Sequence, residues 1–417
     1  MRKVTLVRGA RQLLTLRGPS GPRRGADLRN LGIIQDGAVL IADGVIREVG
    51  PTRRLENLAL ARGAEEIDAS GRVVMPGFVD SHAHLAGGPA RVSDYEMRLG
   101  GATEEQIVHA GGGSLAVARA IHELSPRALE TLALRALEEA VRHGTTALEA
   151  KSGLGLTEAG ELKILRVHAG LRELPVTVVS TFLATRVPPE FGERLLPMLR
   201  RRKLAEFAEV RCGVGFGEAA FTPEQARRYL SLARELGFGL KLNAGPHSNP
   251  GAIAAAIEIG AASVGNVAEA SERDAMLLAQ SPTIAIMMPG AVFHGETHRS
   301  STARRLIDHG AAVALASGYH PYDCPSQNMQ MTIALACRTL QMTAAEAIAA
   351  STINAAHALR RAASIGSIEA GKSADLLMLS VPDYRELPYH LGVNLVDLVT
   401  SRGAVLVEKS GVKWPVH

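Results

Sequence analysis

Two histidines spaced two residues apart, His82 and His84, are the residues of this chain best suited to chemistry. They follow an apolar stretch, residues 75–79. Side chains alternate across a β-strand, so residues i and i+2 point to the same side. A strand that ends here would place two imidazoles side by side, as a metal site needs. A catalytic zinc takes about three protein ligands, so the remaining partners must come from elsewhere in the chain.

Eight apolar stretches alternate with helical patterns from about residue 75 and predict the strands that would position such a site. Besides the stretch that leads to the histidine pair, these stretches end near Glu149, Phe182, Cys212, Asn243, Val267, Met288 and Ser317. Eight alternating units predict an α/β fold, a closed (β/α)8 TIM-type barrel. Active sites in such barrels lie at the carboxyl ends of the strands, so residues at and just after each strand end are the candidates for function.

Regular patterns support this division into helices and strands. Residues 126–144 repeat apolar residues at helical spacing, with a proline at the start and a glycine at the end, and predict a helix. Residues 38–42 and 45–49 are two apolar stretches separated by Asp43-Gly44, a dipeptide typical of hairpins.

Strand patterns also return near the end of the chain, at residues 374–379 and 404–407. We expect these strands to pair with the N-terminal ones. The predicted organisation is a small β-sandwich domain built from both termini, residues 1–70 plus 365–417, and a barrel over residues 71–364.

The composition is that of a soluble globular protein, with 46% hydrophobic and 21% charged residues in a chain of 417. The net charge is +4, no basic run with interleaved aromatic residues is present, and we expect no nucleic-acid partner. We expect no membrane partner and no secretory signal, because no apolar stretch is long enough. The three cysteines cannot all pair and lack metal-ligand spacing, which favours a cytoplasmic protein.

Several short motifs occur at the predicted strand ends and between them, in a fixed order. They are residues 76–85, 111–113, 149–153, 181–183, 289–291, 352–356 and 366–376. Through these motifs nearly the whole chain resembles the amidohydrolase superfamily, and within it the imidazolonepropionase family, which opens a cyclic imidazolone in histidine breakdown. The resemblance implies an amidohydrolase barrel with one divalent metal, zinc or iron, and hydrolysis of a cyclic amide C–N bond.

The chain departs from the family pattern where the resemblance implies metal and catalytic residues. Asn243 stands in place of the third metal histidine, and Asn266 in place of a histidine at the sixth strand end. Gly318 stands in place of the aspartate that binds the metal and accepts a proton. A neutral amide is a poor match for zinc, and glycine offers neither a ligand atom nor a base. We therefore expect a degenerate metal site with no cofactor, or with weakly bound zinc or iron, and the catalytic residues stay unknown.

His82 and His84 then have two interpretations: a residual ligand pair, or side chains retained for packing. Three residues just beyond the lost ligands, His247, His320 and Asp323, could rebuild a shifted site with them. The alternative is that these three are solvated side chains on loops.

The candidates for substrate binding are Arg91, Lys151, Arg186 and His320. The resemblance implies that Arg91 is the one intact substrate contact; a leucine and the turn 320–322 replace others. The guanidinium groups of Arg91 and Arg186 match a carboxylate, or form surface salt bridges instead. Lys151 is equally suited to a structural ion pair with Glu149. We expect a small anionic partner molecule and a possible homodimer.

Two functions are consistent with these observations, and whether the protein is an enzyme stays open. We favour an imidazolonepropionase-like protein without the ancestral metal-assisted hydrolysis, which binds a small anionic ligand or acts as a partner subunit. The alternative is an active hydrolase of a cyclic amide that uses a shifted metal site or a metal-free mechanism. A purely structural or interaction protein would need a large exposed apolar face.

Overall fold

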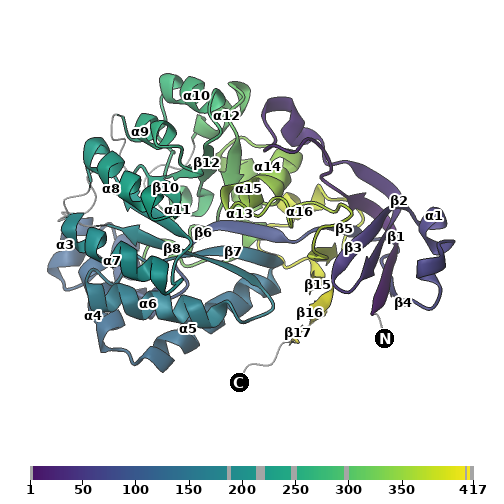
Figure 1. The fold of residues 1–417 in the computed structure, drawn as a ribbon, viewed down its shortest axis with the longest axis horizontal. Helices are drawn as coiled ribbons and strands as arrows, with labels where there is room; N and C mark the ends of the chain where they lie inside the picture. The colour runs from purple at the N-terminus through teal and green to yellow at the C-terminus, as the bar shows by residue number, and fades with distance from the viewer. Residues whose placement is uncertain are drawn as a thin grey trace.

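The barrel is formed by eight parallel strands that follow one another in chain order (Figure 1). The computed structural model of the chain describes residues 3–185, 189–212, 221–245, 251–294, 300–408 and 411–413. The barrel strands are β6 (Phe78–Ala83), β7 (Thr145–Lys151), β8 (Thr177–Ala184), β9 (Phe207–Arg211), β10 (Gly239–Asn243), β11 (Ser263–Gly265), β12 (Ile284–Met287) and β13 (Val313–Leu315). A parallel bridge between Ala83 and Tyr319 closes the circle beside the histidine pair. The predicted α/β barrel is confirmed, and the strands end within about two residues of the expected positions.

Helices surround the barrel strands and bury their apolar faces against them. They are α2 (Val92–Leu99), α3 (Glu104–His109), α4 (Gly113–Glu123), α5 (Pro126–Arg142), α6 (Glu158–Leu171), α7 (Pro189–Arg201), α8 (Pro223–Glu235), α9 (Ala252–Glu258), α10 (Glu272–Ala279), α11 (Pro289–His294), α12 (Thr302–Asp308), α13 (Met329–Thr339), α14 (Ala344–Ala350) and α15 (Ile353–Ala358). The helix predicted over residues 126–144 is α5. The Ser125 hydroxyl accepts from the amide of Ala128 and caps it, and Gly144 ends it with φ +100°.

Within the described residues, a second sheet contains nine strands from both ends of the chain. They are β1 (Val4–Leu14), β2 (Ile33–Ala42), β3 (Val45–Pro51), β4 (Glu65–Asp68), β5 (Val73–Pro76), β14 (Leu376–Leu379), β15 (Val396–Ser401), β16 (Ala404–Glu408) and β17 (Gly411–Val412). The order is β17-β16-β15-β14-β5-β1-β2-β3, with β4 paired to β1. Short helical segments accompany these strands: η1 (Gly25–Arg29), α1 (Thr52–Glu56), η2 (Ala59–Ala61) and α16 (Glu386–Tyr389).

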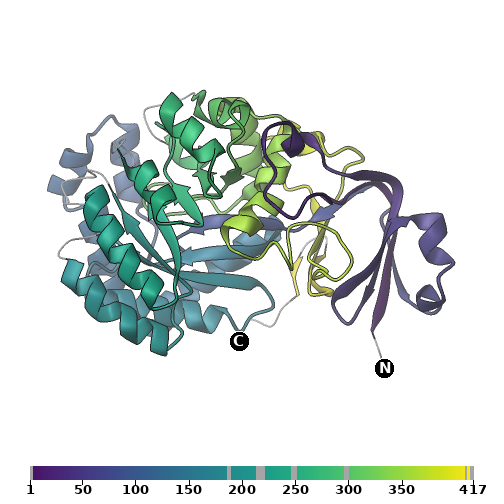
Figure 2. The same ribbon diagram turned by 45° about the horizontal axis from the view of Figure 1, so that its top comes forward.

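The pairing of β5 with both β1 and β14 joins the two chain ends, as the sequence predicts. The N-terminal strands project from the barrel, and β15 and β16 lie between them and the barrel helices (Figures 1 and 2). The hairpin between β2 and β3 turns at Asp43 and Gly44, both with positive φ. The domain boundaries themselves stay a prediction. Among the described helices none is long and apolar enough to cross a membrane.

Candidate functional site

His82 and His84 lie side by side at the carboxyl end of β6. Their ring centroids are 5.4 Å apart, and both side chains are buried. Burial lowers the pKa of both imidazoles well below its usual value, helped by Lys151 near His82 and by His320 near His84. Both rings are therefore neutral at neutral pH. Their Nδ1 atoms are buried and have no hydrogen-bond partner among the described residues. Each ring therefore has a nitrogen that is available for a ligand.

Asn243 occupies the end of β10, where the resemblance implies a metal histidine. Its Oδ1 atom accepts hydrogen bonds from the amide of Gly245, at 3.0 Å, and from Nδ2 of Asn266, at 2.9 Å. A carbonyl oxygen has two lone pairs, and here both face donors. The amide oxygen that a cation would need is therefore already engaged.

Gly318 follows β13 in a left-handed conformation, with φ +67°. Its amide donates to the carbonyl of His82 at 3.1 Å and helps to close the barrel. A Cβ atom at this position would lie 3.2 Å from the side chain of Met288. The turn is therefore suited to glycine, and a side chain here would be both strained and crowded.

Four charged side chains fill the barrel interior next to the histidine pair. Lys241 Nζ lies 2.8 Å from Glu149, and Lys151 Nζ lies 3.3 Å from the same carboxylate. Lys151 also forms an ion pair with Glu209. All four are essentially inaccessible to solvent. Burial by itself would raise the pKa of Glu149, but the two ammonium groups outweigh it and lower that pKa.

Lys151 thus lies within a buried ion-pair network, and the structure does not bring it into contact with Arg91. Neither carboxylate of this network, Glu149 or Glu209, is free of an ammonium partner. After burial, the charge of Lys151 contributes to the lowered pKa of both His82 and His84.

His320 is brought next to the pair, because its ring centroid lies 5.2 Å from that of His84. Its Nδ1 atom accepts from the backbone amide of Tyr322 at 3.2 Å, which leaves Nε2 for other contacts. Asp323 is about half exposed and lies 3.9 Å from both His320 and Arg98, away from the pair. His247 and Arg186 lie outside the described residues. Within those residues, no three His, Cys, Asp or Glu side chains are arranged to hold a metal ion.

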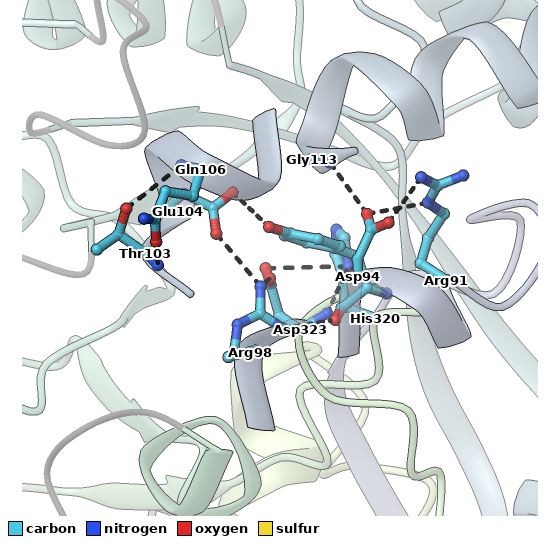
Figure 3. A network of polar contacts seen from close by, with 10 residues as sticks. Arg91, Asp94, Arg98, Thr103, Glu104, Gln106, Gly113, His320 and Asp323 are labelled. Atoms are coloured by element: carbon cyan, nitrogen blue, oxygen red, sulfur yellow. Dashed lines mark hydrogen bonds and ion pairs between the residues drawn. The ribbon is translucent and has the colours of Figure 1, made fainter. Parts of the chain in front are cut away.

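Arg91 precedes α2 and is engaged within the chain (Figure 3). Its guanidinium donates to both carboxylate oxygens of Asp94, at 3.0 Å and 2.7 Å. The amide of Gly113 donates to the same carboxylate at 3.0 Å. The anion that the glycine triplet and Arg91 hold in this structure is therefore Asp94, a partner that the sequence analysis missed. The spacing of three residues between the arginine and the aspartate is the sequence feature that could have indicated this ion pair.

A family model described as "Amidohydrolase family" matches residues 73–405 of the chain. The chain belongs to this family. This amidohydrolase-family chain is 40% identical to the imidazolonepropionases of Symbiobacterium thermophilum, across 98% of both chains, and of Geobacillus kaustophilus, across 97% of this chain and 98% of that one. It is therefore an imidazolonepropionase-like member.

Among solved structures, a triazine hydrolase variant superposes with a TM-score of 0.79 at 16% identity, covering 99% of this chain and 96% of that one. A. niger ochratoxinase superposes with a TM-score of 0.71 at 18% identity, covering 98% and 96%. These structures support the amidohydrolase fold.

In this amidohydrolase-family chain, Tyr322 joins the turn after β13 to α3. Its buried hydroxyl donates to the carboxylate of Glu104, and the Arg98 guanidinium lies 4.6 Å from its ring centroid. Arg98 also contacts Glu104 at 3.3 Å. A row of rings, His84, His320 and Tyr322, thus runs from the buried pair to α3, with centroid separations of 5.2 Å and 6.2 Å. These side chains occupy space above the pair.

Replacing Tyr322 by phenylalanine is expected to lower the free energy of unfolding by about 1–2 kcal/mol. The variant loses the hydrogen bond to Glu104 and leaves a half-buried carboxylate with one partner fewer. Urea unfolding measures the change. The matched control is Tyr389→Phe, at a side chain that is 73% exposed, where we expect less than about 0.5 kcal/mol. Equal losses in the two variants would contradict the assigned contact.

Proposed function

We propose that this imidazolonepropionase-like protein has lost metal-assisted hydrolysis and binds a small anionic molecule at the carboxyl end of the barrel. The observation that carries the proposal is the state of Asn243 and Gly318. The amide oxygen of Asn243 already accepts two hydrogen bonds, and Gly318 has a left-handed backbone conformation and no side chain. The family pattern assigns a metal-binding histidine to position 243. To position 318 it assigns an aspartate that both binds the metal and accepts a proton.

The donors at this end of the barrel do not fit a catalytic divalent metal. Of the ligand positions in the family pattern that the structure describes, those of His82 and His84 still carry imidazoles, whereas a catalytic zinc takes about three protein ligands and an open position. The buried carboxylate of Asp80 on the same strand already accepts from the amide and hydroxyl of Ser317 and from the amide of His82.

An anion fits the same surroundings better. A neutral imidazole can donate one N–H group, and the Nδ1 atoms of His82 and His84 have no partner among the described residues. The positive charge of Lys151 favours an acceptor that carries negative charge. Arg91 would join such a site only if the ligand displaced Asp94, so we assign it no direct contact.

A second candidate is an active hydrolase of a cyclic amide with a shifted metal site or a metal-free mechanism. The proximity of His320 to His84 favours it, because a third imidazole could replace the missing one. It requires Asp323 or His247 as a further donor, and Asp323 lies 3.9 Å from Arg98 as well as from His320.

Metal analysis and a hydrolysis assay together separate the two candidates. The purified protein is analysed for zinc and iron, and then assayed with imidazolone propionate before and after addition of either metal. The Geobacillus kaustophilus imidazolonepropionase serves as the active reference. We expect less than one metal per ten chains and turnover at least about 10⁴-fold below the reference, since metal and general base are both lost. Stoichiometric metal with turnover, or metal-independent turnover, would refute the first candidate and support the second.

Location and assembly stay predictions. Cys212, Cys324 and Cys337 are unpaired, which is consistent with a reducing cytoplasm. A homodimer is proposed from the family resemblance alone.

A further inference from the structure

A hollow of about 540 Å³ lies where the base of the barrel meets the terminal sheet. Strand β8 begins in its wall, with Val176, Thr177 and Val178. His82 lies at the carboxyl end of the barrel, so this hollow is at the opposite end and is separate from the candidate site. Three arginines line it: Arg172, Arg361 and Arg402.

The arginines are contributed by distant parts of the chain. Arg172 ends α6, and Arg361 lies after α15, so both belong to the barrel. Arg402 lies in the turn between β15 and β16 of the terminal sheet. The hydroxyl-bearing Ser364 and Ser373 are also in the wall. A ligand held by these side chains would touch both parts of the fold.

The charge of this wall is not balanced within the described part of the chain. Arg361 forms an ion pair with Glu206. Arg172 donates to a backbone carbonyl, that of Lys203, at 2.8 Å, and no carboxylate among the described residues lies within 4.0 Å of its guanidinium or of that of Arg402. Asp43 contributes one carboxylate to the wall. Because Glu206 pairs with Arg361, two guanidinium groups, those of Arg172 and Arg402, remain against one lining carboxylate and leave the wall positive.

The buried carboxylate of Asp375 lies behind the wall, and its Oδ2 atom has no hydrogen-bond partner among the described residues. Asp375 accepts from the Ser373 hydroxyl at 2.6 Å and from the Arg402 amide at 2.8 Å. These contacts fix the backbone of the turn but leave the guanidinium of Arg402 free to face a ligand. An arginine fork matches the oxygens of a phosphate group in two parallel hydrogen bonds.

We propose that this hollow is a binding site for a phosphate group, either free phosphate or a phosphate monoester. Arg172 and Arg402 supply guanidinium groups that no described carboxylate pairs with directly, and Arg361 supplies further N–H donors. Because the walls come from the barrel and from the terminal sheet, a bound phosphate links the two and stabilises the folded chain by mass action. The proposal does not depend on whether the barrel mouth retains hydrolysis.

Calorimetric titration of the full-length protein with inorganic phosphate and, separately, with glycerol 2-phosphate tests the site at about 150 mM salt, where weak surface attraction is screened. We expect saturable binding with a dissociation constant below about 1 mM and a rise in melting temperature. The tighter of the two ligands identifies the source. Arg172→Gln and Arg402→Gln are each expected to weaken binding at least tenfold.

Arg127→Gln is the matched control, because Arg127 is an exposed arginine of α5 that does not line the hollow. It should bind phosphate as the unmodified protein does. Circular dichroism of each variant without phosphate verifies the fold, which is expected to be intact because Arg402 is exposed and Arg172 is partly exposed. The absence of saturable binding would overturn the proposal, as would equal affinities in the Arg402→Gln and Arg127→Gln variants.

Discussion

Replacing Glu149 by glutamine is expected to lower the free energy of unfolding by about 3–5 kcal/mol. Glu149 is fully buried and faces the ammonium groups of both Lys151 and Lys241. Lys151 keeps Glu209 after the change, but Lys241 loses the one carboxylate that lies within ion-pair distance among the described residues. An uncompensated buried charge costs far more than the pair contributes, because no water replaces the lost partner. Urea unfolding followed by circular dichroism measures the loss.

Two further variants make this prediction specific. Glu158→Gln removes a carboxylate from an exposed ion pair with Arg194, and we expect a change below about 0.5 kcal/mol. Adding Lys241→Met to Glu149→Gln removes the stranded charge and should recover part of the lost stability. If Glu149→Gln costs no more than Glu158→Gln, the buried network does not contribute as described.

Restoring both family positions, with Asn243→His and Gly318→Asp in one chain, is expected to raise zinc affinity at least about 100-fold. The reasoning is that even indirect contacts to a metal change affinity by roughly 10- to 100-fold, and here two direct ligands are added. The aspartate pays an energetic penalty for the left-handed turn and its closeness to Met288, of order 1–3 kcal/mol. Competition with a chromophoric chelator measures the affinity.

The control for this experiment is the same double variant with His82→Ala added. The gain should disappear, because His82 would be one of the ligands. No gain in the double variant would mean that Asn243 and Gly318 are not the family's metal positions in this chain. The hydrolysis assay on the double variant then shows whether metal alone restores turnover.

Much of the fold was predictable because it depends on local patterns. The eight strand ends follow from apolar stretches that alternate with helical spacing, and they lie within about two residues of the observed ends. The hairpin at Asp43-Gly44 and the helix α5 depend on residues adjacent in sequence, whose conformational preferences act locally.

The contacts of the candidate site were harder to predict. The pairing of Tyr322 with Glu104 joins residues 218 positions apart, and neither residue type indicates the other. The sequence left Arg91 open between a carboxylate ligand and a surface salt bridge, and it did not identify the nearby Asp94 as the partner. The roles of the site residues stay predictions, since geometry alone does not test them.

By itself, the sequence determined the barrel, the sheet shared by both termini and the presence of a histidine pair at a strand end, because each depends on the period or identity of neighbouring residues. Only the tertiary structure decided that Asn243 is satisfied by Asn266 and that Glu149 holds two lysines. It also brought three arginines together at the barrel base. The physical reason is that hydrogen bonds and charge interactions act over a few ångströms, and the chain brings those groups together only when it folds.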